Sequence, residues 1–374
     1  MPPNKRPNPL IDKAPGLQRV RHLLAVSSCK GGVGKSTVAV NLAYALHGQG
    51  MKVGLFDADV YGPSLPTIVR PRSTDLFSRN ELIVPLEAEG VKLMSFGFVP
   101  TAPGSSGAAI MRGPMVTQVI NQLLTGTDWG ELDYLVIDMP PGTGDIQLTL
   151  TQLIPLTAAI IVTTPQELSF VDVVKGIQMF QKLKVPTIAV VENMAFYECG
   201  QCGHRDYLFG PGVRNRIVEQ FGIHNAFEIP LWSALSQSGD AGRPVLLEQP
   251  DHVVSQTFVA LARAADEEIN RLQTGGANPI ARFVIGRGVV LTWPDGREQD
   301  IDPATLRRRC QCARCIDENT GQPLLDPESV PDDIYPTELH PMGNYAVAVQ
   351  WSDGHDASIY PYDFLATLAA PAVG

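Results

Sequence analysis

Residues 29–37, with the sequence CKGGVGKST, decide the fold of this 374-residue chain. An apolar run, HLLAVSS (residues 22–28), precedes them, and STVAVNLAYALHGQG (residues 36–50), which has a helical pattern, follows. A glycine-rich turn that ends in GK[ST] between a strand and a helix is the phosphate-binding P-loop. Cys29 takes the place of the first glycine of the standard motif, and we expect a small residue to be tolerated there.

The P-loop residues have separate chemical roles. The glycines let backbone N–H groups approach phosphate, and the N-terminus of the following helix favours anions. Lys35 would bring a positive charge to the β- and γ-phosphates, and Ser36 would offer a hydroxyl ligand to Mg²⁺. The residues expected to bind ATP and Mg²⁺ here are Gly31, Gly32, Val33, Gly34, Lys35, Ser36 and Thr37.

Apolar runs alternate with helical segments through residues 21–272, which we assign to one α/β domain. The runs 134–138 (YLVID), 158–163 and 187–192 are typical of buried parallel strands, and segment 168–182 is typical of a helix. The expected fold is therefore a P-loop NTPase with a mostly parallel sheet covered by helices on both faces.

A carboxylate, Asp138, ends the run YLVID. A charge at the end of a buried strand is costly unless it is paired or lies near a metal, so Asp138 is expected to hold Mg²⁺ through water, as a Walker B residue does. The PPGTG run that follows suits a switch loop that senses the γ-phosphate. Asp145, at its end, has two open interpretations, a functional carboxylate or a helix N-cap.

Composition excludes several classes of function. The formal net charge of −10 argues against a general nucleic-acid surface and against attachment to anionic lipid. The sequence contains no run of 18 apolar residues, so we expect no transmembrane helix. Residues 1–20, expected to be flexible, lack the apolar core of a signal peptide, so we expect a cytoplasmic protein, with the plastid stroma or mitochondrial matrix as alternatives. In such reducing compartments the six cysteines are expected to be metal ligands or thiols.

The end of the chain has a different composition. Residues 273–281 resemble a linker, and residues 282–374 are expected to form a small separate α+β domain with short β-like runs and turn signals. This part contains seven arginines, no lysine and fourteen carboxylates, so it carries a formal charge of −7.

A second lysine, Lys30, precedes GGVGK. The form KGGVGK[ST] resembles the deviant Walker A (SIMIBI-type) ATPases, which include the nitrogenase iron protein, the Min/Par partition ATPases and the Mrp/Nbp35 cluster carriers. The resemblance implies that Lys30 reaches the phosphates of a partner subunit, and hence that the protein works as a homodimer. A solvated surface lysine is the alternative.

Cys199 and Cys202 form a CxxC pair, which supplies two of the four ligands of a tetrahedral sulfur site. In a homodimer, a two-fold axis would bring two such pairs together and provide the four thiolates that one shared [4Fe–4S] cluster needs. Three alternatives stay open: a zinc clasp across the dimer, a redox-active dithiol, and a zinc site that includes His204.

Eight motifs within residues 20–270 together resemble the Mrp/Nbp35 (ApbC-type) iron–sulfur carrier family, and most closely its plastid-type high-chlorophyll-fluorescence 101 branch. They are KGGVGKST, DADVYGPS, MRGPM, IDMPPGTGD, PQELSFVDVVKG, ENM, the CxxC pair and SGDAGRP. The resemblance implies a [4Fe–4S] cluster, received from upstream assembly proteins and passed to apo-proteins under the control of a slow ATPase. The MIP18-like domain common in the family is not in this sequence.

The resemblance also implies roles for three further residues. Asp59 is the better candidate for positioning the attacking water, and Asp57 is the second. Asn193 matches the asparagine that contacts adenine in the family, whereas a strand-end asparagine that caps a turn is the alternative.

A second cysteine motif, CxCxxC, lies in the C-terminal domain. The segment resembles the DUF971 domain, which is shared with the N-terminal region of γ-butyrobetaine hydroxylase and implies a structural zinc site. Its ligands would be Cys310, Cys312, Cys315 and His355. His340 is an alternative fourth ligand, a second iron–sulfur site is an alternative occupant, and residues 307–309, all arginine, would help to keep the thiolates charged. We expect this domain to be a docking module.

Two other functions compete with cluster carriage. A zinc or other metal-delivery ATPase would use the same dimer, since thiolates accept zinc readily. A Min/Par-like positioning ATPase would need a cationic membrane helix or a basic DNA face, and the C-terminal stretch FLATLAAPAVG (residues 364–374) has no cationic face.

Overall fold

An eight-stranded sheet lies at the centre of the chain and has the strand order β12-β9-β8-β1-β7-β2-β6-β5. Its strands pair in parallel, except that β5 runs antiparallel to β6. The strands are β1 (Val20–Ser27), β2 (Val53–Asp57), β5 (Leu86–Ala88), β6 (Val91–Ser95), β7 (Leu132–Asp138), β8 (Ala158–Thr163), β9 (Thr187–Asn193) and β12 (Ala226–Ile229). The predicted parallel sheet is therefore confirmed.

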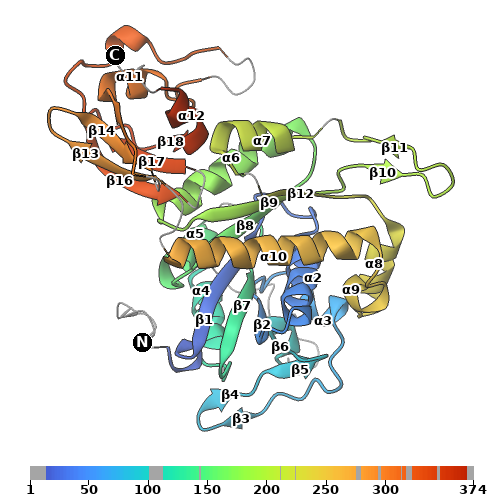
Figure 1. The fold of residues 1–374 in the computed structure, drawn as a ribbon. Coiled ribbons are helices and arrows are strands. Elements are labelled where there is room, and N and C mark those ends of the chain that lie inside the picture. The colour runs from blue at the N-terminus through green and yellow to red at the C-terminus, as the bar shows by residue number, and fades with distance from the viewer. Residues whose placement is uncertain are drawn as a thin grey trace.

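The computed structural model (Figure 1) describes part of the chain in detail. The described residues are 14–100, 113–142, 145–210, 212–223, 225–274, 279–293, 296–312, 314–316, 322–342 and 346–368. Residues 143–144 of the expected switch loop and the side chain of Asp145 lie outside this description.

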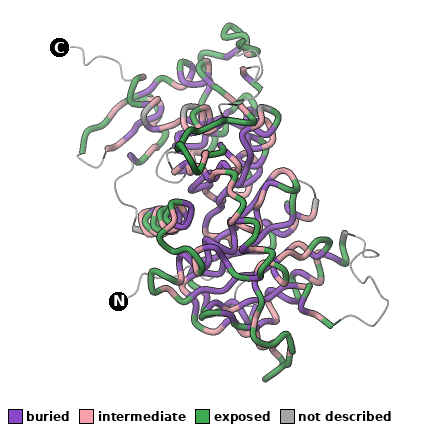
Figure 2. The backbone as a smooth tube through the Cα atoms, turned by 90° about the vertical axis from the view of Figure 1, so that its right-hand side faces the viewer, coloured by how far each residue is buried: buried purple, intermediate pink, exposed green. Residues whose placement is uncertain are grey.

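Helices cover both faces of the sheet (Figure 1). One layer contains α2 (Lys35–Gly48), α3 (Leu65–Ile68), α8 (Ser233–Asp240), α9 (Val245–Glu248) and α10 (Val253–Thr274). The other contains α4 (Gly113–Thr125), α5 (Asp145–Leu153), α6 (Glu167–Lys182) and α7 (Arg214–Phe221). Strand β1 shows why two layers form: Leu23 and Ala25 point into one apolar cluster, and Leu24 and Val26 point into the other. Buried backbone follows the sheet between these layers (Figure 2).

The remaining short elements of this part lie at its edges. They are η1 (Pro15–Leu17), β3 (Ser78–Arg79), β4 (Leu82–Ile83), η2 (Phe96–Phe98), β10 (Tyr197–Glu198) and β11 (Arg205–Asp206). Strands β10 and β11 form a separate hairpin that follows β9.

The C-terminal domain contains two antiparallel three-stranded sheets. The first consists of β13 (Ile280–Val284), β14 (Gly288–Thr292) and β15 (Glu298–Ile301), and the second of β16 (Pro336–Met342), β17 (Ala346–Trp351) and β18 (Ser358–Pro361). Its helices are α11 (Pro303–Arg308), η3 (Pro327–Ser329) and α12 (Tyr362–Thr367). Side chains from both sheets, such as Leu291 and Val349, share one apolar core with α11 and α12.

The C-terminal domain packs directly against the NTPase domain. Four of its side chains join the apolar cluster that contains Ile177 and Phe180 of α6, namely Met342, Ala346, Ala348 and Ile359. The Gln181 side chain donates a hydrogen bond to the Ser358 carbonyl at 3.4 Å. The C-terminal domain therefore has its own apolar core and also packs on the NTPase domain, beside α6 and α7.

Two expected boundaries also differ in the structure. Residues 14–20, expected to be flexible, are ordered, because Leu17 is buried in the core and Gly16 lies too close to the Thr127 carbonyl for any side chain. Within the expected linker, α10 continues to Thr274 and β13 begins at Ile280. Residues 275–278 lie outside the described residues.

Because α10 packs on the core, a substitution that leaves a cavity beneath it should lower the free energy of unfolding strongly. Phe258 on α10 is fully buried, so Phe258→Ala should lower the free energy of unfolding by about 3–5 kcal/mol. Phe77→Ala removes a mostly exposed ring and should change it by less than about 0.5 kcal/mol. Urea unfolding followed by tryptophan fluorescence measures both, and equal losses in the two variants would contradict this packing.

Candidate functional site

The P-loop connects β1 to α2 at the carboxyl edge of the sheet. Gly32 and Gly34 have φ angles of 77° and 84°, in the left-handed region that favours glycine. A Cβ atom at Gly34 would lie 2.2 Å from the amide nitrogen of Asn193, so this position needs glycine for space as well as for conformation. Open space surrounds Gly31 and Gly32, as expected where backbone must approach a phosphate.

A buried ion pair joins this loop to the neighbouring strand. The Lys35 ammonium contacts Asp138 Oδ1, and both side chains are almost inaccessible to water. Because an unpaired charge would be very costly there, each group requires the other, or a ligand that replaces it. The Lys35 nitrogen also lies 3.4 Å from Ser36 Oγ. A lysine, a hydroxyl and a carboxylate thus meet at one point, as the P-loop interpretation predicts.

A cavity of about 320 Å³ opens above the P-loop. Its lining includes Lys30, Ser36, Asp59 and Met194, together with the P-loop glycines. The hydroxyl and carboxylate oxygens of Ser36, Asp59 and Asp138 are the donors that Mg²⁺ prefers. The cavity therefore brings together most of the residues predicted to bind ATP and Mg²⁺.

Asp57 and Asp59 have different environments. Asp57 is buried, and its Oδ2 accepts hydrogen bonds from the backbone of Ser64 and Leu65 and from the Ser95 hydroxyl. Asp59 faces the cavity, and its Oδ1 accepts one hydrogen bond, from the backbone of Gly62. Asp57 therefore shapes the loop, whereas Asp59 is the carboxylate open to a water molecule.

Lys30 forms an ion pair with Asp172 of α6 at 3.1 Å. Its side chain remains about one-third exposed at the rim of the cavity. Asp172 was not among the residues singled out from the sequence, because only the packing of α6 beside the P-loop brings it there.

Cys29 lies on the other side of the loop, against Gly176 of α6. Burial and the nearby Asp172 carboxylate raise the pKa of Cys29 to about 12. This thiol is therefore protonated and unreactive at neutral pH, which agrees with its expected role as a tolerated small residue.

Asn193 is engaged by the P-loop itself. Its side-chain amide donates a hydrogen bond to the Val33 carbonyl at 2.8 Å, and the residue is buried. This contact braces the P-loop against the end of β9. Contact with adenine stays a prediction.

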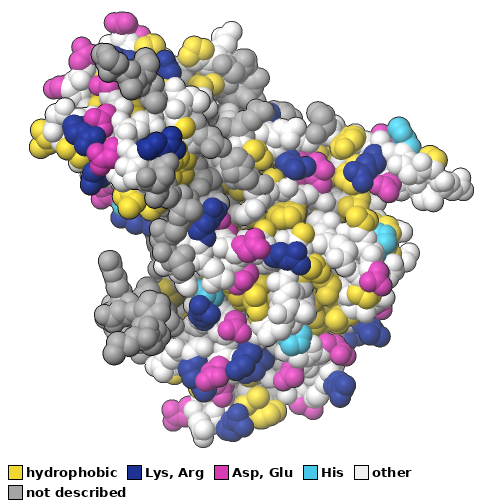
Figure 3. Space-filling view, viewed as in Figure 1, with side chains coloured by type: hydrophobic (Ala, Val, Ile, Leu, Met, Phe, Trp, Pro, Cys, Tyr) yellow, Lys and Arg dark blue, Asp and Glu magenta, His cyan; other side chains and the backbone are white. Residues whose placement is uncertain are grey.

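The pair Cys199 and Cys202 lies on a hairpin of residues 197–206, here called the Cys hairpin, which projects from the body of the protein (Figures 1 and 3). Cys202 is exposed and Cys199 is partly exposed. Hydrogen bonds from the backbone N–H groups of Gln201 and Cys202 lower the pKa of Cys199, which favours the thiolate. Both sulfur atoms therefore lie on a part of the surface that solvent reaches.

An apolar cavity of about 830 Å³ lies at the base of the Cys hairpin. Its lining includes Phe196, Leu231 and Trp232, and the Trp232 ring stacks on His252 at 3.7 Å. Sequence reasoning missed this surface, because its residues come from three segments that the fold brings together.

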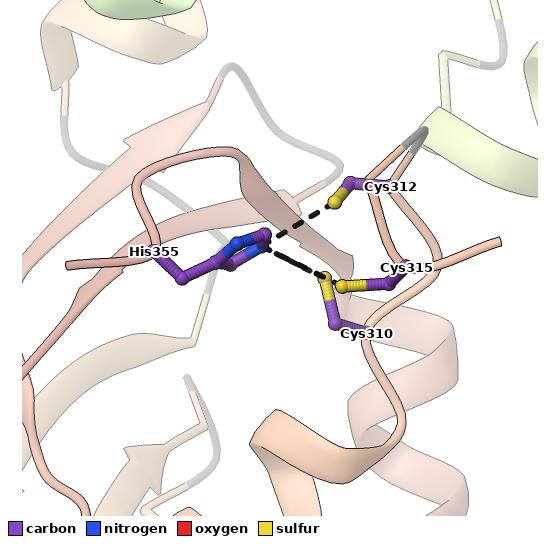
Figure 4. Close-up of side chains that lie close together, drawn as sticks. All are labelled: Cys310, Cys312, Cys315 and His355. Atoms are coloured by element: carbon purple, nitrogen blue, oxygen red, sulfur yellow. Dashed lines mark hydrogen bonds between the residues drawn. The ribbon is translucent and has the colours of Figure 1, made fainter. Parts of the chain in front are cut away.

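The cysteines of the C-terminal domain meet a histidine (Figure 4). The Nε2 atom of His355 lies 3.5, 3.3 and 3.8 Å from the sulfur atoms of Cys310, Cys312 and Cys315. One tetrahedral ion, with metal–sulfur bonds of about 2.3 Å and metal–nitrogen bonds of about 2.0 Å, separates its ligand atoms by about 3.5–3.8 Å. All four atoms lie within 4.8 Å of one another, so the arrangement fits one ion.

Two alternative ligands lie outside this set of four. His340 instead contacts Glu338 at 2.6 Å. Within the described part of the chain, the Cys310, Cys312, Cys315 and His355 set is the one group of three or more close ligands, and a zinc site that combines His204 with the Cys hairpin stays a prediction.

The α/β fold, the P-loop and the Lys35–Asp138 pair define a P-loop NTPase. The family described as NUBPL iron-transfer P-loop NTPase matches residues 19–265, and the chain belongs to this family. Residues 285–366 match the family described as gamma-butyrobetaine hydroxylase-like, N-terminal.

Curated relatives and a solved structure agree with this assignment. A rice protein named Fe-S cluster assembly factor HCF101, chloroplastic, is 51% identical over 94% of this chain and 66% of its own length, so this chain spans about two thirds of that relative. An iron-sulfur cluster carrier protein of Haemophilus influenzae is 45% identical over 68% of each chain. A nucleotide-binding protein of Archaeoglobus fulgidus in complex with ADP is 38% identical, with a TM-score of 0.57 over 66% of this chain and 95% of that one.

Across the described residues, no helix combines the length and the hydropathy needed to cross a bilayer.

The environment of Asp57 predicts a pH dependence of stability. Burial and the nearby Asp138 carboxylate raise the pKa of Asp57 from 3.8 to about 7. The folded state therefore favours the protonated form, and this contribution to stability is complete below pH 3.8 and is lost as the pH rises through about 7. Between pH 5 and 8, the wild type should lose stability relative to Asp57→Asn in urea unfolding without nucleotide. Asp251→Asn, an exposed control, should follow the wild type, and parallel profiles for all three proteins would refute the assignment.

Proposed function

We propose that this chain is an ATP-dependent carrier that holds a [4Fe–4S] cluster between the two copies of a homodimer and transfers it to apo-proteins. The observation that carries the proposal is the exposed Cys199 and Cys202 pair on a hairpin that leaves the sheet next to the P-loop. The names of the rice and H. influenzae relatives support the same cargo.

A short chain segment links the nucleotide cavity to the Cys hairpin. Asn193 contacts the P-loop, and Met194 lines the cavity with a φ angle of 57°, a left-handed conformation that costs about 1–3 kcal/mol outside glycine. Cys199 follows only six residues after Asn193, at most about 20 Å along an extended chain. A conformational change of the P-loop can therefore be transmitted to Cys199 and Cys202 through the short, strained segment that begins at Asn193.

The ligand count supports a homodimer. A [4Fe–4S] cluster takes four thiolates, and the Cys hairpin offers two. A two-fold axis beside the hairpins would present all four, with the same surface of each copy facing the other. The apolar lining beside the hairpin, with Phe196 and Trp232, suits burial in such an interface.

The residues of the nucleotide cavity suggest how ATP binding and hydrolysis control the bound cluster. Lys35, Ser36 and Asp138 would hold the phosphates and Mg²⁺, which supplies charge neutralisation on the transferred phosphoryl group. Asp59 would orient the attacking water, and Lys30 would leave Asp172 to reach the phosphates in the partner subunit. Hydrolysis would then shift the P-loop and, through Asn193 and Met194, the Cys hairpin, so slow turnover acts as a timer.

The partners follow from this cargo. Upstream assembly proteins would load the cluster, and apo iron–sulfur proteins would receive it, with neither nucleic acid nor membrane required. Free thiolates need a reducing compartment, so we place the protein in the cytoplasm, with the plastid stroma or mitochondrial matrix as alternatives.

Removal of the cysteine pair tests the cargo. Wild-type protein, reconstituted under anaerobic conditions, should contain about four iron and four sulfide per two chains, and Cys199→Ala/Cys202→Ala should contain none. Cys29→Ala is the matched control and should keep the full content. Zinc at the pair, with no sulfide after reconstitution, would instead favour a metal-delivery ATPase.

Substitution of the cavity carboxylate tests the hydrolytic role. Asp59→Asn should reduce ATP hydrolysis by at least about 100-fold, because it removes the group that orients water, while ATP binding stays within about threefold. Phosphate release and nucleotide binding measured by calorimetry give the two values. Wild-type hydrolysis in Asp59→Asn would exclude this role.

A further inference from the structure

The metal ligands of the C-terminal domain come from two separate segments. Residues 310–315 follow α11, whereas His355 lies in the loop between β17 and β18. The two segments are about 40 residues apart in the sequence, so contacts between them decide whether the four ligand atoms stay at ligand distance.

Arg307, in the last turn of α11, makes this contact. Its Nε donates to Asp353 Oδ2 at 2.9 Å, and its Nη1 donates to the sulfur of Cys315 at 3.4 Å. The second oxygen of Asp353 accepts the backbone N–H of His355 at 2.9 Å. One guanidinium thus connects a thiolate ligand in the first segment to the backbone of the histidine ligand in the second.

The burial of Arg307 makes the connection rigid. Only 6% of its side chain is exposed, although it carries a full charge. A buried guanidinium needs acceptors for its planar set of N–H donors, and here the Asp353 carboxylate and the Cys315 sulfur accept them. A lysine could keep the charge but not both directed hydrogen bonds.

A second buried thiolate has its own donor. The Ser358 hydroxyl accepts a hydrogen bond from the Trp351 indole at 3.0 Å, so its proton is free to point toward the sulfur of Cys310 at 3.2 Å. Ser358 belongs to the same β17–β18 side of the site as His355. Both contacts therefore connect a cysteine of the first segment to the second.

We propose that Arg307 is the positioning residue of this metal centre. It holds Cys315 and His355 in the arrangement that one tetrahedral ion of the zinc type requires, and thereby slows release of the ion. The centre is then a retained structural site and not a second site for cargo. This inference does not depend on cluster carriage, since the Cys hairpin belongs to the other domain.

The neighbouring arginine provides a matched control. Arg308 points away from the centre, and its Nη2 donates to the Val330 carbonyl at 3.0 Å and pairs with Asp332. Residues 307–309 were all expected to assist the thiolates. In the structure Arg307 contacts a cysteine ligand, whereas Arg308 contacts Val330 and Asp332 instead. Substitution of either arginine by methionine removes the same charge.

The test compares full-length wild type, R307M, R307K and R308M loaded with Zn²⁺. Release of zinc to the chelator 4-(2-pyridylazo)resorcinol should be about 10–100-fold faster in R307M, intermediate in R307K and unchanged in R308M. In Co²⁺-loaded protein, R307M should shift or weaken the visible bands of a tetrahedral S₃N site, a change that loss of a distant structural contact would not cause.

Two results would overturn the inference. Equal zinc release and equal Co²⁺ spectra in R307M and R308M would show that Arg307 does not position the ligands. If R307M does not fold, R307K is compared with R308K, because both variants keep the positive charge. Equal rates of zinc release from these two variants would also refute the inference.

Discussion

The buried ion pair between Lys35 and Asp138 is the interaction on which the rest of the structure depends. It fixes the start of α2 to the end of β7, and β7 pairs directly with β1, the strand that leads into the P-loop. Because parallel strands end at the same edge, the loops after β1, β2, β7 and β9 meet around this pair. The Cys hairpin follows β9, so the cysteines leave the sheet at the edge where nucleotide binds.

Helix α6 connects this edge to the C-terminal domain. In its first half Asp172 pairs with Lys30, in its middle Gly176 packs against Cys29, and near its end Gln181 contacts Ser358. Its 16 residues span about 24 Å. The rim of the nucleotide cavity and the C-terminal domain therefore contact different turns of one helix, which explains why the C-terminal domain docks on the NTPase domain.

Local sequence signals predicted the P-loop, the strands and the three cysteines of the C-terminal metal centre, whereas the resemblance to the DUF971 domain implied its histidine, His355. Those features depend on short spacings, such as GK[ST] after glycines or CxCxxC, and on apolar runs whose length matches a strand. The contacts of Asp172 with Lys30, of Asn193 with Val33 and of Arg307 with Asp353 were not predictable in this way. Each depends on how distant segments pack, as when Asn193 contacts Val33 across 160 positions.

In the proposed homodimer, two chains share one cluster through their Cys hairpins. Native mass spectrometry of the anaerobically reconstituted protein tests it most directly. We expect a species of two chains that carries one [4Fe–4S] cluster, together with the mass of one zinc ion for each chain. A cluster carried by a single chain, or a dimer whose cluster persists in Cys199→Ala/Cys202→Ala, would contradict it.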